Sequence, residues 1–506
     1  MNDVTENYKS FGRIKIWLNT LLILSIAGGI FLMLPHLTDE IWQDEAYTLF
    51  RFASKGFWYP FADYHVPNNH MLFSAILSKW WEPGDSLIYL RSLPLGVFIL
   101  SLLLVAIAAE GLGGIFVAVL TTVMFSASNI TESFALQLRG YSLSWLPITA
   151  ILLVMPLFAQ YGNWYWAIIY LFVAAASVAI IPTNILICLV FMLWGMAQVF
   201  NCQEVRMHTK WGRALTLFLG PFLGLIIYVP VWDQFADHSH NYISSWSKVA
   251  VLQHWIWASL FEYVWMAPIL LLGLVSLVYK ARRDPAFGIG SPRNNLTLLI
   301  VTVAALPAWL VVLPSSPYPR NFVPFLPVWY FLAALLFVSG WNFCFQRKQR
   351  LGQVVFIPLA AAAFIYTLSS KPCTSFGINK EFPQDLCRQF YHEQYYPTKT
   401  VQALEILSKN KPIPVLSDFE GQYSLGFVVE NTAHSKFDLM HYRQWKGLLT
   451  NGGASYPPLI VTRSNNDLEK NLGELGLSAD KYVNITSTGY YKIFGLSTLW
   501  KPAHIQ

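Results

Sequence analysis

Two pairs of adjacent acidic residues follow the first long apolar run of the chain. They are Asp39 with Glu40 and Asp44 with Glu45, in the stretch LTDEIWQDEAYTLF, where aromatic residues accompany them. A carboxylate that is held partly desolvated at a membrane surface can act as a general base on a hydroxyl group. The alternative is a polar loop with solvated acids, and the aromatic neighbours favour the chemical interpretation.

Two arginines farther along the chain are suited to binding phosphate. Arg139 lies in FALQLRGYSL, and Arg320 lies in SPYPRNFVPFLP, where several prolines predict irregular backbone. A guanidinium binds phosphate through two parallel hydrogen bonds and stabilises the charge that develops as a phosphate leaves. Irregular backbone at membrane depth is tolerated mainly where it is buried in protein or lines a cavity. The alternative for both arginines is an anchor at the lipid headgroups.

A further polar cluster occupies the segment DYHVPNNH. Its members are Asp63, His65, Asn68, Asn69 and His70. Contact with a substrate, or a structural role, is the favoured interpretation. A divalent metal bound by His65 and His70 is the alternative, although their spacing matches no strong ligand motif.

The elements that carry these residues are predicted to be membrane helices. The chain is 55% hydrophobic and only 12% charged, whereas soluble proteins carry about 25% charged residues. Because a span needs roughly 20 apolar residues, we expect a polytopic α-helical membrane protein with about 11 transmembrane helices. The predicted spans are 16–37, 87–109, 111–128, 142–160, 164–181, 183–200, 214–232, 257–279, 295–313, 322–345 and 352–370.

Lysine and arginine clusters in the short loops predict the orientation of these spans. With eleven spans, the cluster before the first span and the three later clusters fall on one face, which is therefore expected to be cytoplasmic, like the N-terminus. A transmembrane domain is thus predicted over 1–370, and an outer α/β domain over 371–506. In this outer domain the sequence predicts helices over 398–409 and 467–475, extended segments over 414–417, 427–430 and 459–462, and paired strands over 482–495. The predicted outer loops are 38–86, 129–141, 233–256 and 314–321. A helix at the membrane interface is expected from Met71 to Trp81.

The net charge of +6 and the five cysteines indicate which partners and which disulfide to expect. The basic residues are spread over short loops and form no basic domain, so no nucleic-acid partner is expected. The expected partner of the apolar helices is the lipid bilayer. Cys373 and Cys387 flank a polar stretch after the last predicted span, where an oxidising environment would favour a disulfide. The other three cysteines are expected to pack as small apolar side chains.

The acidic segment IWQDEAYTLF resembles the first-loop motif of the GT-C glycosyltransferases. This superfamily includes protein O-mannosyltransferases and the lipid A aminoarabinose transferase. Three further segments resemble its later motifs in the same order and on the same predicted face: YHVPNNHMLFSAIL, FALQLRGYSL and SPYPRNFVPFLP. The resemblance implies that Asp44 is the catalytic residue, with Glu45 beside it. Candidate substrate-binding residues in the later segments are Asn69, His70, Arg139, Tyr141, Tyr318 and Arg320.

The resemblance implies a donor sugar carried on a polyprenyl phosphate. Asp44 would deprotonate an acceptor hydroxyl, whose oxygen would attack the anomeric carbon with inversion while Arg139 and Arg320 bind the leaving phosphate. The acceptor is a glycan, a lipid or a protein, and a divalent metal cofactor is left open. The expected location is the inner, or plasma, membrane, with the transfer on its outer side.

Three other functions are weighed against this one. A transporter or flippase of a lipid-linked sugar is less favoured, because the predicted spans hold almost no ionisable groups that could relay protons. A ligase or polymerase of surface polysaccharide shares the donor and the orientation, and only the first-loop acidic motif argues against it. A receptor or scaffold would leave the loop motifs unexplained.

Overall fold

The computed structural model describes most of the chain. The described residues are 2–66, 69–202, 206–241, 247–260, 263, 266–284, 286–312, 319–345, 355, 358, 397–408, 413–417, 419–431, 438–441, 444–445, 456–462, 465–488 and 491–500. The chain divides into two compact units, each built from separate stretches of sequence. The first unit is Met1–Leu37, Trp58–Ile76 and Arg91–Cys387, and the second is Thr38–Phe57, Leu77–Leu90 and Arg388–Gln506.

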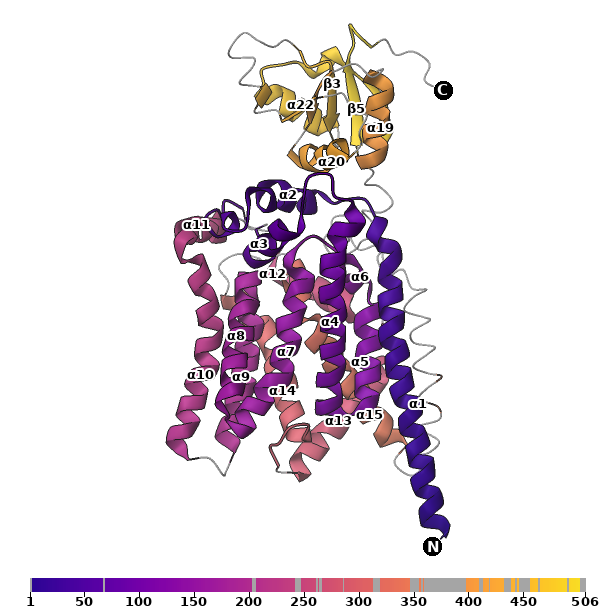
Figure 1. Ribbon diagram of the computed structural model, residues 1–506, viewed down its shortest axis with the longest axis vertical. Coiled ribbons are helices and arrows are strands. Elements are labelled where there is room, and N and C mark those ends of the chain that lie inside the picture. The colour runs from indigo at the N-terminus through magenta and orange to yellow at the C-terminus, as the bar shows by residue number, and fades with distance from the viewer. Residues whose placement is uncertain are drawn as a thin grey trace. The chain divides into compact units, whose positions relative to one another are not determined.

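Long apolar helices dominate the first part of the chain (Figure 1). Their bounds are α1 Asn2–Met33, α4 Leu87–Gly113, α5 Ile115–Ala127, α7 Gly140–Tyr161, α8 Trp164–Ile180, α9 Ile185–Asn201, α10 Met207–Leu225, α13 Ala267–Arg283, α14 Pro292–Val312 and α15 Leu326–Cys344. Among the described residues, six helical stretches are long and apolar enough to span a membrane. A seventh results if α5 is counted with α6 (Asn129–Ala135), to which it is bent by 64°. A polytopic helical membrane protein is therefore confirmed, and the number of eleven spans stays a prediction.

Short helices fill the segments between these spans. They are η1 Leu34–Thr38, α2 Gln43–Arg51, η2 Ala53–Lys55, η3 Tyr59–Phe61, α3 Met71–Trp80, η4 Pro182–Asn184, η5 Ile226–Val231, α11 Trp232–Asn241, α12 Lys248–Leu260 and η7 Pro319–Phe325. The helix predicted over 71–81 is confirmed as α3. The span predicted over 257–279 overlaps the end of α12 and most of α13, and four residues between these helices lie outside the described residues, so this span stays a prediction. Pro268 stands in the first turn of α13, where proline favours the start of a helix.

Glycines allow α13 and α15 to pack closely in the first unit. A Cβ atom at Gly340 would collide with the carbonyl oxygen of Ile269, and one at Gly273 would collide with that of Leu336. Small residues at such a contact let helix backbones approach one another, which is a common way for membrane helices to associate.

Gly340→Leu is expected to destabilise the bundle, because the added side chain must push these two backbones apart. Overpacking of this kind costs about 1–3 kcal/mol or more, and we expect a lower apparent melting temperature in detergent. Gly96→Leu on α4 is the matched control, since a Cβ atom there has no neighbour within 4 Å. Equal melting temperatures for both variants and the wild type would contradict the close packing.

The second unit contains a five-stranded mixed sheet with the strand order β2-β1-β3-β5-β4. The strands are β1 Pro414–Ser417, β2 Asp438–His441, β3 Leu459–Thr462, β4 Tyr482–Thr488 and β5 Tyr491–Leu496. β1 pairs in parallel with β2 and β3, while β5 pairs in antiparallel fashion with β3 and β4. The predicted α/β character of the tail is confirmed. The predicted domain boundary after residue 370 lies outside the described residues and stays a prediction.

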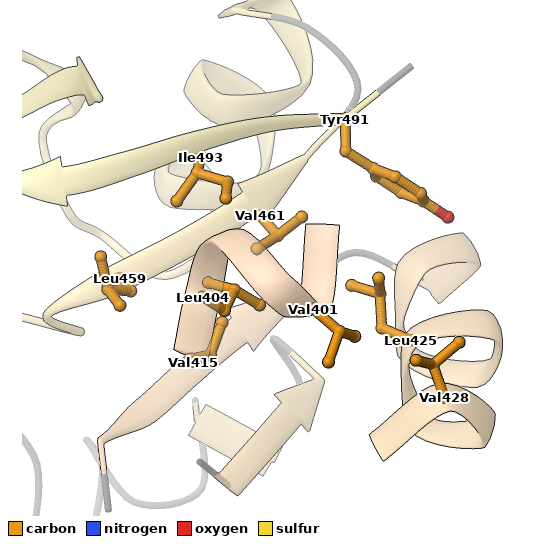
Figure 2. Packing of buried hydrophobic residues seen from close by; sticks show 9 residues of the cluster. All are labelled: Val401, Leu404, Val415, Leu425, Val428, Leu459, Val461, Tyr491 and Ile493. Atoms are coloured by element: carbon orange, nitrogen blue, oxygen red, sulfur yellow. The ribbon is translucent and has the colours of Figure 1, made fainter. Parts of the chain in front are cut away.

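Apolar residues on both faces of this sheet position its helices, which are α19 Pro397–Ser408, α20 Phe419–Asn431 and α22 Asn465–Glu474. α19 and α20 cover one face (Figure 2), and their side chains form a buried cluster with the strands. Its members are Val401, Leu404, Val415, Leu425, Val428, Leu459, Val461, Tyr491 and Ile493. On the other face, Leu468 and Leu472 of α22 pack against Leu416 and Ile460. The sheet is thus sandwiched between helices.

One predicted element of the tail is wrong. The segment 427–430 is expected from the sequence to be extended, but it forms the last part of α20. Leu425 and Val428 both point into the cluster of Figure 2. This spacing of three residues places them on one face of a helix, and a short apolar run cannot by itself distinguish a helix from a strand.

Candidate functional site

Arg139 is the residue that precedes α7, and it is 2% exposed. Its guanidinium carbon lies 5.0 Å from the centre of the Tyr141 ring, a geometry in which the aromatic face attracts the cation. Tyr141 is also buried and packs edge-on against Phe134 of α6, with 4.8 Å between the ring centres. The aromatic pair therefore fixes the direction of the Arg139 side chain.

His70 joins the start of α3 to the start of α7. Its carbonyl oxygen accepts the hydrogen bond from Ser74 that opens α3, and its Nδ1 accepts a hydrogen bond of 2.7 Å from the Gly140 amide. The imidazole ring also contacts the Tyr141 ring edge-on, with 5.0 Å between the centres. A Cβ atom at Gly140 would lie 2.9 Å from the Cβ of His70, so only glycine allows this approach.

Arg320 is half-buried in the first turn of η7. The Nε1 of Trp145, on α7, donates a hydrogen bond of 3.0 Å to the carbonyl oxygen of Val323 and so secures η7 against α7. Burial, together with the positive charges of Arg139 and Arg320, holds the pKa of His70 well below its ordinary value. Both arginines therefore lie close enough to act on one imidazole, which is neutral at pH 7. Sequence reasoning missed Trp145, whose role depends on a contact with a distant segment.

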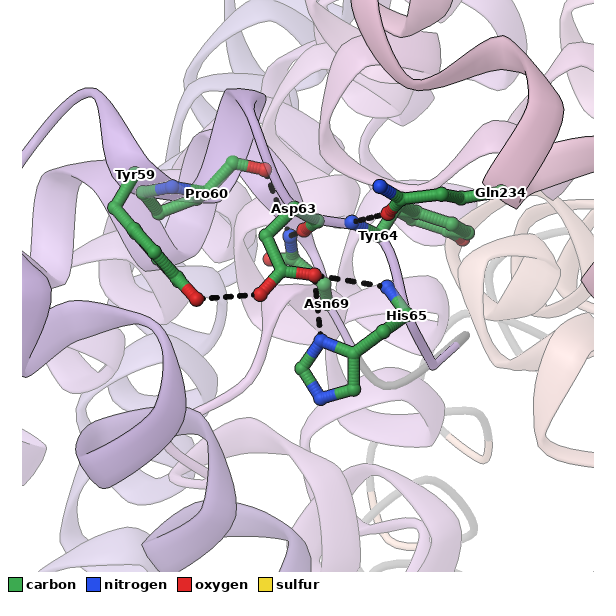
Figure 3. Close-up of polar contacts among 7 residues, drawn as sticks. All are labelled: Tyr59, Pro60, Asp63, Tyr64, His65, Asn69 and Gln234. Atoms are coloured by element: carbon green, nitrogen blue, oxygen red, sulfur yellow. Dashed lines mark hydrogen bonds and ion pairs between the residues drawn. The ribbon is translucent and has the colours of Figure 1, made fainter.

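The rest of the segment before α3 is held by its own hydrogen bonds (Figure 3). Asn69 is fully buried and donates from Nδ2 to the carbonyl oxygens of Pro60 and Asp63, each at 2.8 Å. The carboxylate of Asp63 accepts hydrogen bonds from the Tyr59 hydroxyl and from Nδ1 of His65. Burial raises the pKa of Asp63, but the hydrogen bonds from Tyr59 and His65 outweigh it, so the pKa is lowered. These contacts indicate a structural role for Asn69.

The alternative of a metal site receives no geometric support from the described residues. His65 and His70 each use Nδ1 for a different partner, a carboxylate and a backbone amide. In the part of the chain that the structure describes, no group of three or more His, Cys, Asp or Glu side chains could hold a metal ion.

The two acidic pairs, Asp39 with Glu40 and Asp44 with Glu45, belong to the second unit. Glu45 is 1% exposed, and its Oε2 accepts a hydrogen bond of 2.9 Å from the Trp42 amide, which satisfies a free donor at the start of α2. Asp44 stands in the same first turn and is half-buried. Its carboxylate gains from the positive end of the helix dipole. Glu45 thus has a clear structural partner, and Asp44 is the better candidate for chemistry.

Contacts within the second unit hold α2 in place. The Tyr47 ring packs edge-on against Tyr423 of α20, with 4.7 Å between the ring centres. Glu40 accepts a hydrogen bond of 2.8 Å from the hydroxyl of Thr398, at the start of α19. The sequence assigned no role to Glu40, and the structure shows that its carboxylate connects the segment before α2 to the start of α19.

Several features predicted from the sequence lie outside the described residues. These are Tyr318, the Cys373–Cys387 pair and nearly all of the predicted span 352–370. The structure brings Arg139, Tyr141, His70 and Arg320 together in the first unit. The expected approach of Asp44 to these arginines stays a prediction.

These features define a polytopic membrane protein with an α/β unit, and solved structures of the same fold exist. ArnT from Cupriavidus metallidurans, bound to undecaprenyl phosphate, is 14% identical over 95% of this chain and 99% of its own, with a TM-score of 0.55. The same protein in the apo state is 12% identical over 96% and 99%, with a TM-score of 0.54. At this level of identity the likeness concerns the fold, which this chain therefore shares with ArnT. Neither the protein-family models nor the curated proteins match the sequence.

Proposed function

We propose that the protein is a membrane glycosyltransferase that takes its sugar from a polyprenyl-phosphate donor. The observation that carries this proposal is the pair of arginines beside a buried, neutral histidine at the start of α7. Two guanidiniums can bind the single negative charge of the donor phosphodiester and the second charge that develops as its phosphate leaves. The binding of undecaprenyl phosphate by ArnT, which shares the fold, supports the lipid class of the donor.

The leaving group of such a donor is a phosphate on which negative charge develops. Arg139 and Arg320 would stabilise that charge in the transition state, which is the usual source of catalysis at anionic leaving groups. The positive end of the α7 dipole lies beside Arg139 and adds to the effect. Because His70 is neutral, it adds no third cation that would hold the product phosphate too tightly.

Asp44 is proposed as the general base. It takes the proton of the acceptor hydroxyl while the hydroxyl oxygen bonds to the anomeric carbon. The bond from that carbon to the phosphate oxygen breaks, and its electron pair stays with the phosphate. A single displacement of this kind inverts the anomeric centre. The acceptor is a glycan, lipid or protein, and the transferred sugar is a hexose or pentose.

The proposed location is the inner membrane, with a cytoplasmic N-terminus and the α/β unit on the outer side. Four clusters of Lys and Arg in short loops support this orientation. Transfer would then occur on the outer side, where Asp44 follows the first span.

The test is a proteoliposome assay with a polyprenyl-phosphate sugar that carries one label on the sugar and another on the lipid. We expect free polyprenyl phosphate to appear together with labelled acceptor. The intact donor appearing in the opposite leaflet, with no release of polyprenyl phosphate, would instead identify a flippase and overturn the proposal.

A further inference from the structure

We propose that His70 is a positioning residue, which fixes the first turn of α7, and with it Arg139, by accepting the Gly140 amide proton at Nδ1. The importance of Arg139 rests on the proposed function, whereas the hydrogen bond itself is independent of it. His70 would thus act through the backbone of α7 and would not bind the substrate directly.

An arginine just before a helix creates a specific structural problem. The first four amide groups of a helix, of which that of Gly140 is the first in α7, have no partner within the helix. A Ser, Thr, Asp or Asn just before a helix usually supplies an acceptor oxygen to the second or third of them. Arginine has five donors and no acceptor, and the Arg139 side chain makes no capping hydrogen bond to α7. The acceptor must therefore come from elsewhere in the chain, and Nδ1 of His70 provides it at 2.7 Å from the Gly140 nitrogen.

The residues around His70 hold its ring close to the Gly140 amide. The side chain is 4% exposed, and a Cβ atom at Gly140 would lie only 3.0 Å from its Nδ1. The ring also contacts Tyr141, the residue whose aromatic face holds the Arg139 guanidinium. One imidazole therefore supports both the backbone and the aromatic neighbour of Arg139.

The hydrogen bond also determines where the imidazole proton lies. Because the Gly140 amide donates to Nδ1, this nitrogen carries a lone pair and the single ring proton is on Nε2. A protonated imidazole has donors at both nitrogens and would lose the contact. Burial and the charges of Arg139 and Arg320, which lower the pKa of His70, keep the ring in the accepting form.

Three substitutions of His70 distinguish the role of Nδ1 from that of Nε2. In His70→Asn the amide oxygen can replace Nδ1, in His70→Gln the amide reaches the position of Nε2, and His70→Leu has no polar group. Hydrogen exchange of the Gly140 amide, measured in nanodiscs without ligand, should stay protected in His70→Asn. We expect it to exchange about tenfold faster or more in the other two variants. The same substitutions at His208, which is exposed on α10, are matched controls and should leave this amide unchanged.

Binding of undecaprenyl phosphate to the same proteins gives the second measurement. We expect the Kd to rise about tenfold in His70→Leu and His70→Gln, and to stay within about twofold of the wild type in His70→Asn. Nitrogen NMR of ¹⁵N-histidine-labelled wild-type protein should show His70 with an unprotonated Nδ1.

Two results would overturn the positioning role. One is an NMR spectrum in which Nδ1 of His70 is protonated. The other is unchanged Gly140 exchange in all His70 variants together with weaker lipid binding in His70→Asn, since this pattern indicates direct contact with the ligand. If Gly140 exchange follows the expected order but neither these variants nor Arg139→Ala changes lipid binding, the positioning role holds and the proposed donor site is wrong.

Discussion

Asp44→Asn is expected to lower the rate of sugar transfer by about 10²–10⁴-fold, the usual contribution of a general base. The substitution keeps the size of the side chain but removes its ability to accept the acceptor proton. Binding of undecaprenyl phosphate should be almost unchanged, because the phosphate is assigned to the arginines. The measurement is single-turnover transfer of labelled sugar in proteoliposomes, in parallel with lipid binding.

Two neighbouring acids serve as comparisons for Asp44. Asp39→Asn makes the same chemical change outside the proposed machinery and should transfer sugar at the wild-type rate. Glu45→Gln weakens the hydrogen bond that opens α2, so it should lower thermal stability more than Asp44→Asn does. A wild-type rate in Asp44→Asn, or an equal loss in Asp39→Asn, would remove Asp44 from the role of base.

Arg139→Ala is expected to raise the Kd for undecaprenyl phosphate by about 10- to 100-fold, since hydrogen bonds to charged groups are worth about 1.5–3 kcal/mol. Arg139→Lys keeps the charge but loses the paired hydrogen bonds, so its Kd should lie between those of the wild type and Arg139→Ala. Arg320→Ala should weaken binding in the same direction. The measurement is lipid binding in nanodiscs at several salt concentrations.

Arg213 offers a matched control for the substitution of arginine by lysine at position 139. It belongs to α10 and donates a hydrogen bond of 2.8 Å to the carbonyl oxygen of Ala159, near the opposite end of α7. Arg213→Lys therefore alters an arginine bound to the same helix without touching the proposed phosphate site. Weaker lipid binding in Arg213→Lys but not in Arg139→Lys would show that the anion binds elsewhere.

The sequence predicted the large features of this molecule because they depend on local composition. Long windows without charge predicted the membrane helices, and the tail was predicted as alternating helices and strands, most of which the structure contains. The prediction for residues 427–430 failed because a short apolar run, here Phe427 to Val429, fits either a helix or a strand. The start of α2 could not be predicted from the usual capping box, in which Ser or Thr precedes the helix and Glu follows three residues later. Here Trp42 occupies the position of the Ser or Thr, although Glu45 is present.

The candidate site could be predicted only in part, for a similar reason. The resemblance to a known family and the chemistry of the side chains together selected Arg139, Arg320 and His70 as candidates. The contacts that give them their roles join distant segments, such as the Gly140 amide with His70 and Trp145 with Val323. Hydrogen bonds of this kind have no local sequence signature, because they depend on how the helices pack.

The most direct test of the account is a cryo-electron microscopy structure of the protein in nanodiscs with a bound polyprenyl-phosphate sugar. We predict that the phosphate lies within hydrogen-bond distance of Arg139 and Arg320, with the Asp44 carboxylate on the opposite side of the anomeric carbon. A phosphate bound away from both arginines, or an Asp44 carboxylate that cannot reach the sugar, would contradict it.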